Sequence, residues 1–83
     1  MKLVYFAWLK ERIGTAEEVV APPAGVDTVS ALLEWLRGRG PNYAMALANP
    51  AVVRVAVNLE HRKGDWPIGP DDEIAIFPPV TGG

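Results

Sequence analysis

The feature that most restricts the fold of this 83-residue sequence is one amphipathic helix set among short β-rich segments. Between Asp27 and Gly38, apolar residues recur at i, i+3, i+4 and i+7 and so share one helical face: Val29, Leu32, Leu33 and Leu36. Asp27 or Thr28 can cap the start, and Gly38 is expected to end the helix in a left-handed conformation. A chain this short makes one domain, so its strands must bury their apolar faces against this helix.

Four β-rich segments flank the helix. Residues 2–10 (KLVYFAWLK) are predicted to form one long strand, which turns near Gly14 and returns as a second strand over about 17–21. Residues 52–58 (VVRVAVN) alternate along a third strand, and 73–77 (EIAIF) form the last. The first two strands would make an N-terminal hairpin.

The rest of the chain is predicted to be a short helix and an irregular crossing. The helix begins at Pro41 and turns Leu47 inward, and residues 59–72 are turn-rich with Ile68 as their inward anchor. This order of elements predicts a single α+β domain over residues 1–83, with a mixed sheet packed on one main helix. A β-grasp, ubiquitin-like fold requires this order.

The composition of the chain excludes several classes of function. The formal charge of −2 argues against binding to nucleic acid or to an anionic membrane. The sequence has no cysteine, which excludes thiolate nucleophiles and iron–sulfur sites. The longest apolar run, residues 3–9, is far shorter than the ~20 residues of a membrane span and lacks the anatomy of a signal peptide. We therefore expect a cytoplasmic protein.

No catalytic or metal-binding constellation is evident. His61 is the sole histidine and lies among charged residues, as expected for a solvated turn. Asp65, Asp71, Asp72 and Glu73 lack the register of a calcium loop. Ser30 has no neighbouring base, so the chain is not expected to hold a metal or to catalyse a reaction by itself.

Two phenylalanines are candidates for a binding surface. If Leu3 and Tyr5 face the helix, Phe6 emerges on the opposite side of the sheet, and Phe77 can join it there. One alternative is that residues 59–72 cover both side chains. The other is an apolar patch that binds a protein.

The sequence FPPVTGG at 77–83 offers a different chemistry. Pro78 and Pro79 favour an extended root, and Val80 to Gly83 can reach ~13–14 Å beyond it. Glycine has no Cβ, so this tip can enter a narrow channel. Adenylation would make its carboxylate electrophilic; a sulfur donor then gives a thiocarboxylate, and an amine gives an amide. A cloning remnant is the alternative explanation.

The sequence resembles the small subunits of molybdopterin synthase, a family of ubiquitin-like sulfur carriers. The similarity runs almost end to end, through FAWLKE at 6–11, TVSALLEWL at 28–36, AVN at 56–58 and DDEIAIFPPVTGG at 71–83. The ending PPVTGG is its most specific part. The sequence departs from the family at Asp71, where glycine is usual, and this substitution puts the stability of that turn in doubt.

The resemblance implies a role for the tail. An activating enzyme similar to ubiquitin E1 would use ATP to adenylate Gly83, next to Gly82, and the adenylate would become a thiocarboxylate; no cofactor would be bound permanently. The tail would enter the large synthase subunit in a heterotetramer and supply sulfur to cyclic pyranopterin monophosphate, the pterin precursor of molybdopterin.

The resemblance also implies which residues contact the large subunit, while the catalytic residues would lie on that subunit. The expected contacts are Phe6, Lys10, Phe77, Pro78, Pro79, Val80 and Thr81. Two alternatives stay open: a sulfur carrier for thiazole synthesis, and a ubiquitin-like modifier of lysines.

Overall fold

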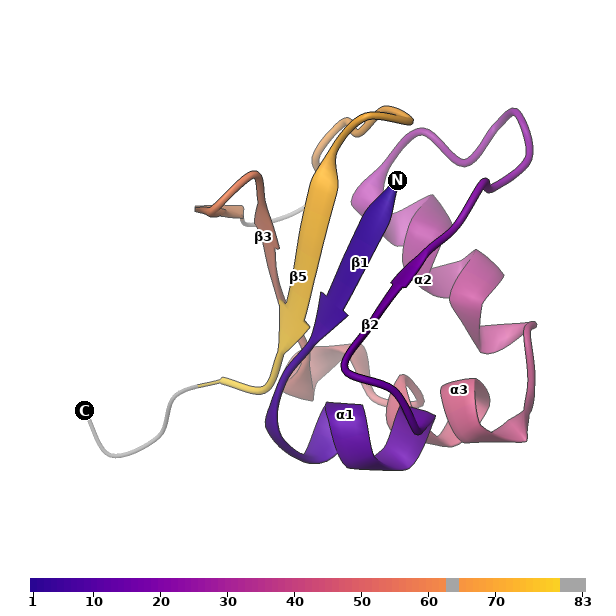
Figure 1. The fold of residues 1–83 in the computed structure, drawn as a ribbon, viewed down its shortest axis with the longest axis vertical. Coiled ribbons are helices and arrows are strands. Elements are labelled where there is room, and N and C mark those ends of the chain that lie inside the picture. Colours follow the sequence, from indigo (N-terminus) through magenta and orange to yellow (C-terminus); the bar gives the residue numbers. More distant parts are fainter. Residues whose placement is uncertain (63–64, 80–83) are drawn as a thin grey trace.

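The computed structural model describes residues 1–62 and 65–79. Along the chain the elements are β1 (Lys2–Tyr5), α1 (Ala7–Ile13), β2 (Glu17–Val19), α2 (Val29–Arg37), α3 (Pro41–Ala46), the 3₁₀ turn η1 (Pro50–Val52), β3 (Arg54–Val57), β4 (Glu60–Arg62) and β5 (Glu73–Phe77). The strands form one sheet in the order β2-β1-β5-β3-β4 (Figure 1). Strand β5 is parallel to β1 and antiparallel to β3, so the sheet is mixed.

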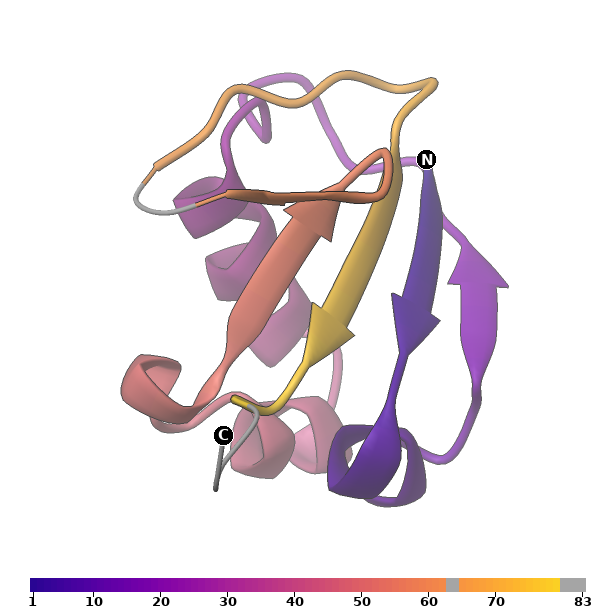
Figure 2. The same ribbon diagram turned by 90° about the vertical axis from the view of Figure 1, so that its left-hand side faces the viewer.

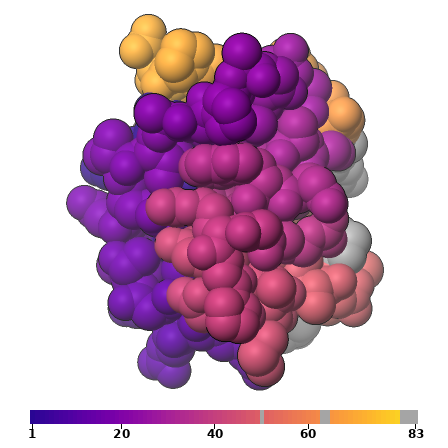
Figure 3. Space-filling view, turned by 90° about the vertical axis from the view of Figure 1, so that its right-hand side faces the viewer, coloured from indigo at the N-terminus to yellow at the C-terminus, as the bar shows by residue number. Residues whose placement is uncertain are grey.

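The helices α2 and α3 lie on one side of this sheet. Figure 2 shows the other side, with the sheet in front and α2 behind it, and Figure 3 shows the helical side. The side of the sheet turned away from α2 is called the outer face below. The predicted α+β architecture, a mixed sheet packed on one main helix, is confirmed.

Helix α2 forms where its apolar periodicity places it. Thr28 is the N-cap, and its Oγ1 accepts a hydrogen bond from the Ala31 amide at 3.2 Å. The predicted left-handed conformation of Gly38 is wrong, because its φ is −80°. The helix instead tightens at its end: the Gly38 amide donates to the Trp35 carbonyl and the Arg39 amide to that of Leu36.

The predicted long strand over residues 2–10 is also wrong. The strand stops at Tyr5, and residues 7–13 form α1, so β1 and β2 are antiparallel neighbours joined through a helix. Two buried residues four apart, Leu9 and Ile13, give α1 its inward face. Gly14 is the left-handed C-cap, with φ 99°, so it ends this helix and does not turn a hairpin.

The second half of the chain follows the prediction more closely. Strand β3 lies inside the predicted segment 52–58, and Ile68 is buried, as expected of an inward anchor. The prediction missed β4, a three-residue edge strand of polar residues within the segment expected to be irregular.

The turn before β5 tolerates Asp71 without strain. Positive φ angles occur at three non-glycine residues in the described part of the chain, and Asp71 is not one of them. The Asp72 amide donates to the Gly69 carbonyl at 3.1 Å, and the Asp72 carboxylate accepts from the Gly69 amide at 2.8 Å. Hydrogen bonds from the Asn58 side chain and the Gly69 amide lower the pKa of Asp72. The aspartate therefore brings no left-handed penalty here.

One hydrophobic cluster fills the space between the sheet and α2. Its members are Leu3, Tyr5, Leu9, Ile13, Val20, Val29, Leu32, Leu36, Ala46, Leu47, Val53, Val55, Val57, Ile68, Ile74 and Ile76. Within residues 1–62 and 65–79, no helix has the length and apolar character needed to cross a membrane.

A polar cluster of Glu18, Tyr5, Tyr43 and Arg39 lies at the edge of this core. The Glu18 carboxylate accepts hydrogen bonds from the hydroxyls of Tyr5 at 2.7 Å and Tyr43 at 2.8 Å, and it pairs with Arg39 at 2.8 Å. The Arg39 guanidinium also lies over the rings of Trp35 and Tyr43. These contacts tie β1 and β2 to the C-terminal end of α2 and to α3.

The surroundings of Glu18 favour its charged form. Desolvation opposes ionisation, but hydrogen bonds from Tyr5, Arg39 and Tyr43 outweigh it and lower the pKa of Glu18. Burial, reinforced by the hydrogen bond to Glu18, raises the pKa of Tyr5. The folded protein therefore holds a carboxylate between two neutral tyrosines.

Replacing Glu18 should therefore destabilise the fold. We expect Glu18→Ala to lower the free energy of unfolding by about 2 kcal/mol, because two tyrosine hydroxyls and a guanidinium lose their acceptor. Since the pKa of Glu18 is lower in the folded than in the unfolded chain, its stabilisation is complete above pH ~4.3 and is lost as the pH falls through the folded pKa. Urea unfolding of both proteins at pH 7 and pH 3 measures this; an equal difference at both pH values would contradict it.

Candidate functional site

The candidate site is the end of the sheet at which β5 ends and Pro78 and Pro79 follow. Strand β5 is held on both sides, by β1 and by β3, and its two isoleucines, Ile74 and Ile76, are fully buried. At the last rung the Phe6 amide donates to the Ile76 carbonyl at 3.1 Å, and Phe77 pairs with Arg54 of β3. The segment that follows Phe77 thus starts from the most firmly held strand of the sheet.

Phe6 and Phe77 are neighbours on the outer face. Their preceding residues, Tyr5 and Ile76, are paired in the parallel ladder and buried, so the next residue of each strand points the other way. Phe6 is 49% exposed. Phe77 is half-buried, because the His61 ring of β4 lies 5.0 Å from it. The segment 59–72 therefore covers Phe77 in part, and Phe6 remains exposed.

The other predicted contact residues lie around this pair or beyond it. Lys10 is exposed on α1, one helical turn after Phe6. Pro78 and Pro79 follow β5 and are half-buried. The remaining predicted tail positions are outside the described residues: Val80, Thr81, Gly82 and Gly83.

A strained residue follows Phe6. Ala7 has φ 56°, a left-handed conformation that costs an ordinary residue roughly 1–2 kcal/mol. This single residue turns the chain sharply from extended Phe6 into α1. Strain of this kind persists where the surrounding structure imposes it, and it is concentrated at functional sites.

Two residues that sequence reasoning had not assigned to the site flank Phe77. Arg54 is its cross-strand partner, and His61 pairs with Ala56, two residues further along β3. The position of Arg54 could have been predicted, since it alternates with the buried residues Val53 and Val55. The position of His61 could not, because its strand was not predicted.

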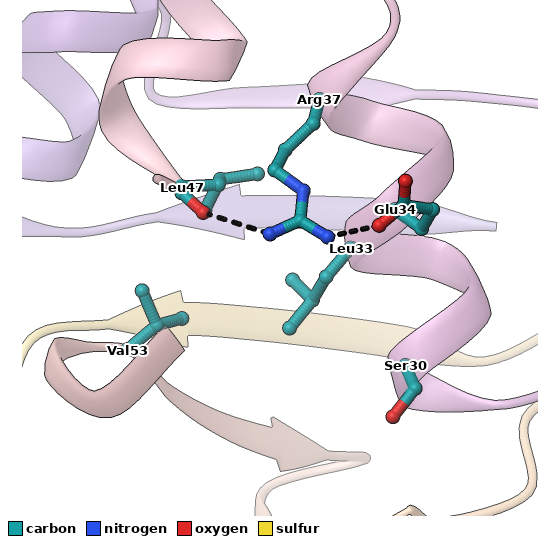
Figure 4. Close-up of a pocket in the computed structure, with 6 residues that line it drawn as sticks. All are labelled: Ser30, Leu33, Glu34, Arg37, Leu47 and Val53. Carbon is teal, nitrogen blue, oxygen red and sulfur yellow. Dashed lines mark hydrogen bonds and ion pairs between the residues drawn. The ribbon is translucent and has the colours of Figure 1, made fainter. Parts of the chain in front are cut away.

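A groove on the helical side is a weaker candidate. It encloses about 230 Å³ between α2 and the segment leading into β3, and its lining residues are Ser30, Leu33, Glu34, Arg37, Leu47 and Val53 (Figure 4). The Arg37 guanidinium donates to the Leu47 carbonyl at 3.5 Å and pairs with Glu34. Ser30 has no histidine among these neighbours, so the groove offers no activated nucleophile.

Metal chemistry finds no support in the described part of the chain either. Among residues 1–62 and 65–79, no group of three or more histidine, aspartate or glutamate side chains could hold an ion. Asp65, part of the acidic sequence cluster, instead accepts a hydrogen bond from the Ser30 amide at 2.8 Å, and this bond lowers its pKa. Its carboxylate therefore accepts a hydrogen bond from a backbone amide in the first turn of α2.

The fold and the site define a class of protein: a ubiquitin-like β-grasp domain whose last strand leads into a Pro-Pro segment. Residues 3–83 match the model of the ThiS family, and the chain belongs to that family.

Curated relatives match along nearly their whole length. The chain is 37% identical over 83 residues to the molybdopterin synthase sulfur carrier subunit of Escherichia coli, covering 100% of this chain and 99% of that protein. The subunit of the same name from Haemophilus influenzae is 32% identical, with the same coverage. That from Dictyostelium discoideum is 37% identical over 84 residues, covering 99% of this chain and 94% of the relative.

Solved structures share the fold. A putative molybdopterin converting factor, subunit 1, from Pyrococcus furiosus superposes with a TM-score of 0.77 at 28% identity, covering 95% of each chain. SAMP1 from Haloferax volcanii superposes with a TM-score of 0.73 at 30% identity, covering 100% of this chain and 98% of that one. Both support the ubiquitin-like β-grasp assignment.

The strain at Ala7 can be tested directly. Ala7→Gly should raise the free energy of unfolding by about 0.5–1 kcal/mol, because relief of the left-handed penalty exceeds the entropy that glycine adds to the unfolded chain. Ala44→Gly, at an exposed position inside α3, is the matched control and should lower it by about 1 kcal/mol. Urea unfolding measures both, and a loss of stability in Ala7→Gly would show that Ala7 is not strained.

Proposed function

We propose that this protein is the sulfur carrier subunit of a molybdopterin synthase. The observation that carries the proposal is the full-length match to three curated relatives that all bear this name. The PPVTGG sequence at 78–83 supports it, since a carrier needs a slender reactive end.

The proposed reactive group is the carboxylate of Gly83. A carboxylate is a poor acyl donor because it is anionic and its leaving group would be oxide. ATP converts it to an acyl-adenylate with release of pyrophosphate, and a sulfur nucleophile then displaces AMP to leave a thiocarboxylate. In the synthase this sulfur passes to cyclic pyranopterin monophosphate, and two such transfers make the dithiolene of molybdopterin. Gly82 keeps the approach to Gly83 narrow.

The proposed chemistry needs two partner proteins. An adenylating enzyme similar to ubiquitin E1 activates the tail with ATP, and the large synthase subunit receives the tail and supplies the catalytic residues. In the heterotetramer, Phe6, Phe77 and Lys10 contact the large subunit while Val80 to Gly83 enter it. We place this exchange in the cytoplasm.

The described part of the chain suits a carrier better than an enzyme. Tight packing fixes β5 up to Phe77, so the tail starts from a rigid base. The sheet end beside it presents an aromatic pair, which suits docking. Rate enhancement requires groups preorganised around the reacting atoms, and a partner that encloses the tail can provide them.

The central test is the chemical state of Gly83. In cells with an intact activating enzyme, intact-protein mass spectrometry should find a fraction of the protein with one oxygen replaced by sulfur, and fragmentation should place that sulfur at Gly83. In reconstituted synthase, deleting Gly83 should abolish dithiolene formation while urea unfolding stays within about 0.5 kcal/mol of the wild type, as for changes outside the core.

Three results would decide against this proposal. Protein that carries no sulfur but is joined to lysines of other proteins would mark a modifier. A thiocarboxylate consumed in thiazole formation and not by the large synthase subunit would mark the other sulfur-carrier pathway. A large loss of stability on deleting Gly83 would mean that the tail is structural.

The aromatic pair gives an independent test. Phe6→Gln should weaken binding to the large subunit at least about tenfold, because the complex loses an aromatic anchor that the interface would bury. Met45→Gln is the matched control: Met45 is 67% exposed on α3, in the helical layer, and should leave affinity within about twofold. Calorimetric titration measures both; equal affinities would remove the outer face from the interface.

A further inference from the structure

The phenyl ring of Phe77 is flanked by two basic residues on the outer face, an arginine and a histidine. Arg54 is its cross-strand partner on β3, and the His61 ring lies 5.0 Å away on β4. On the β1 side, Phe6 and then Lys10 continue the same end of the molecule. The surface defined by these five residues, called the tail-root surface below, is therefore an aromatic centre with a basic rim.

Arg54 differs from most of the other basic residues in its partners. Carboxylates neutralise most of the cations elsewhere in the described chain: Lys2 with Glu17 and Glu73, Arg37 with Glu34, Arg39 with Glu18 and Arg62 with Glu60. The Arg54 guanidinium donates only to the carbonyls of Ala51 at 3.3 Å and Val53 at 3.5 Å within residues 1–62 and 65–79. These long contacts leave most of its five donors available.

The rim is basic, whereas the whole chain carries a net negative charge. The formal net charge is −2, so a solvated surface chosen at random would be slightly acidic. Two carboxylates lie close to the rim in sequence: Glu60, which is paired with Arg62, and Glu11, which neighbours Lys10 on α1. Cations remain in excess on the surface that adjoins the tail.

We propose that Arg54 and His61 are recognition residues that bind carboxylates of the large subunit, at the edge of the apolar contact made by Phe6 and Phe77. This inference rests on the proposed function. Its structural basis is continuity: a protein that receives the segment after Pro79 must approach the strand end where these residues lie.

The chemistry of the rim favours a protein over other anionic partners. The guanidinium of Arg54 can engage a carboxylate through two parallel hydrogen bonds. A phosphate polymer or an anionic membrane is attracted by larger clusters of cations, and this chain has a net negative charge. An aromatic centre with a charged rim is the anatomy of a protein interface.

The rim charges would act mainly on the rate of encounter. Oppositely charged patches raise association rates, and rim charges tune this rate and its salt dependence. Charge also opposes docking onto wrong surfaces, because a basic patch on such a surface would repel Arg54. The rim therefore provides specificity that the phenyl rings alone do not.

The test compares Arg54→Glu with a matched control, Arg37→Ala, in the full chain. Arg37 also donates to a backbone carbonyl at 3.5 Å, but it lies on α2 in the helical layer. We expect Arg54→Glu to weaken binding to the large subunit at least about tenfold at low salt, mainly through slower association. The deficit should shrink in 0.5 M salt, where screening is strong. Arg37→Ala should stay within about twofold.

Each outcome of surface plasmon resonance with the large subunit has one meaning. A large, salt-dependent loss for Arg54→Glu, with unchanged thermal unfolding, supports the inference, and a smaller loss for His61→Ala extends it to the second residue. Tight wild-type binding that Arg54→Glu leaves unaltered overturns the inference and leaves the proposed function standing. If the wild type does not bind at all, the proposed function fails. A separate adenylation assay completes the test: if Arg54→Glu slows activation by the adenylating enzyme but leaves binding to the large subunit unaltered, the rim belongs to that enzyme and the inference is overturned.

Discussion

The arrangement of this protein depends on the parallel pairing of its first and last strands. The ladder from Lys2↔Glu73 to Tyr5↔Ile76 joins residues that are 71 positions apart in sequence. Parallel neighbours cannot be joined by a tight turn, so the chain between them must cross over, and α2 fills that crossover with its apolar face. Because both strands point the same way, their C-terminal ends meet at one edge of the sheet. This edge is where Phe6, Phe77 and the start of the tail come together.

The same pairing separates two groups of side chains: those that stabilise the core and those that are available for binding. Tyr5 and Ile76 turn inward and are buried, so the residues that follow them turn outward and are available for binding. The inward side is then secured at its rim by Glu18, which accepts hydrogen bonds from Tyr5 and from Tyr43 of α3. A residue in the polar cluster thus stabilises the strand end on which the binding surface is built. The outward side can vary in sequence without disturbing that anchorage, which separates stability from recognition.

Sequence patterns correctly predicted those elements in which the spacing of apolar residues along the chain matches the face that the element buries. The stripe of α2 and the alternation in β3 and β5 are local signals, and the core confirmed them. Residues 7–10, the first part of α1, were misread as strand because the β-branched and aromatic residues before them extended the strand signal, although Leu9 and Ile13 have helical spacing and Gly14 follows as a cap. The left-handed φ of Ala7 has no sequence signal at all. The aromatic pair could be predicted from alternation, but the approach of His61 to Phe77 depends on tertiary pairing.

In the proposed function the same tail must bind two proteins in turn, the adenylating enzyme and the large subunit. This requirement limits how tightly the tail-root surface can bind either of them. A large apolar patch would hold either partner for long, since dissociation governs most affinity differences. Two phenyl rings, one of them half-covered by His61, limit the apolar area, whereas the rim cations can speed encounter without prolonging the complex. The rigid strand end is already ordered, so its binding avoids the extra entropic cost of ordering a flexible segment. Recognition by a small apolar centre and a charged rim therefore suits a carrier that has to be released after each transfer.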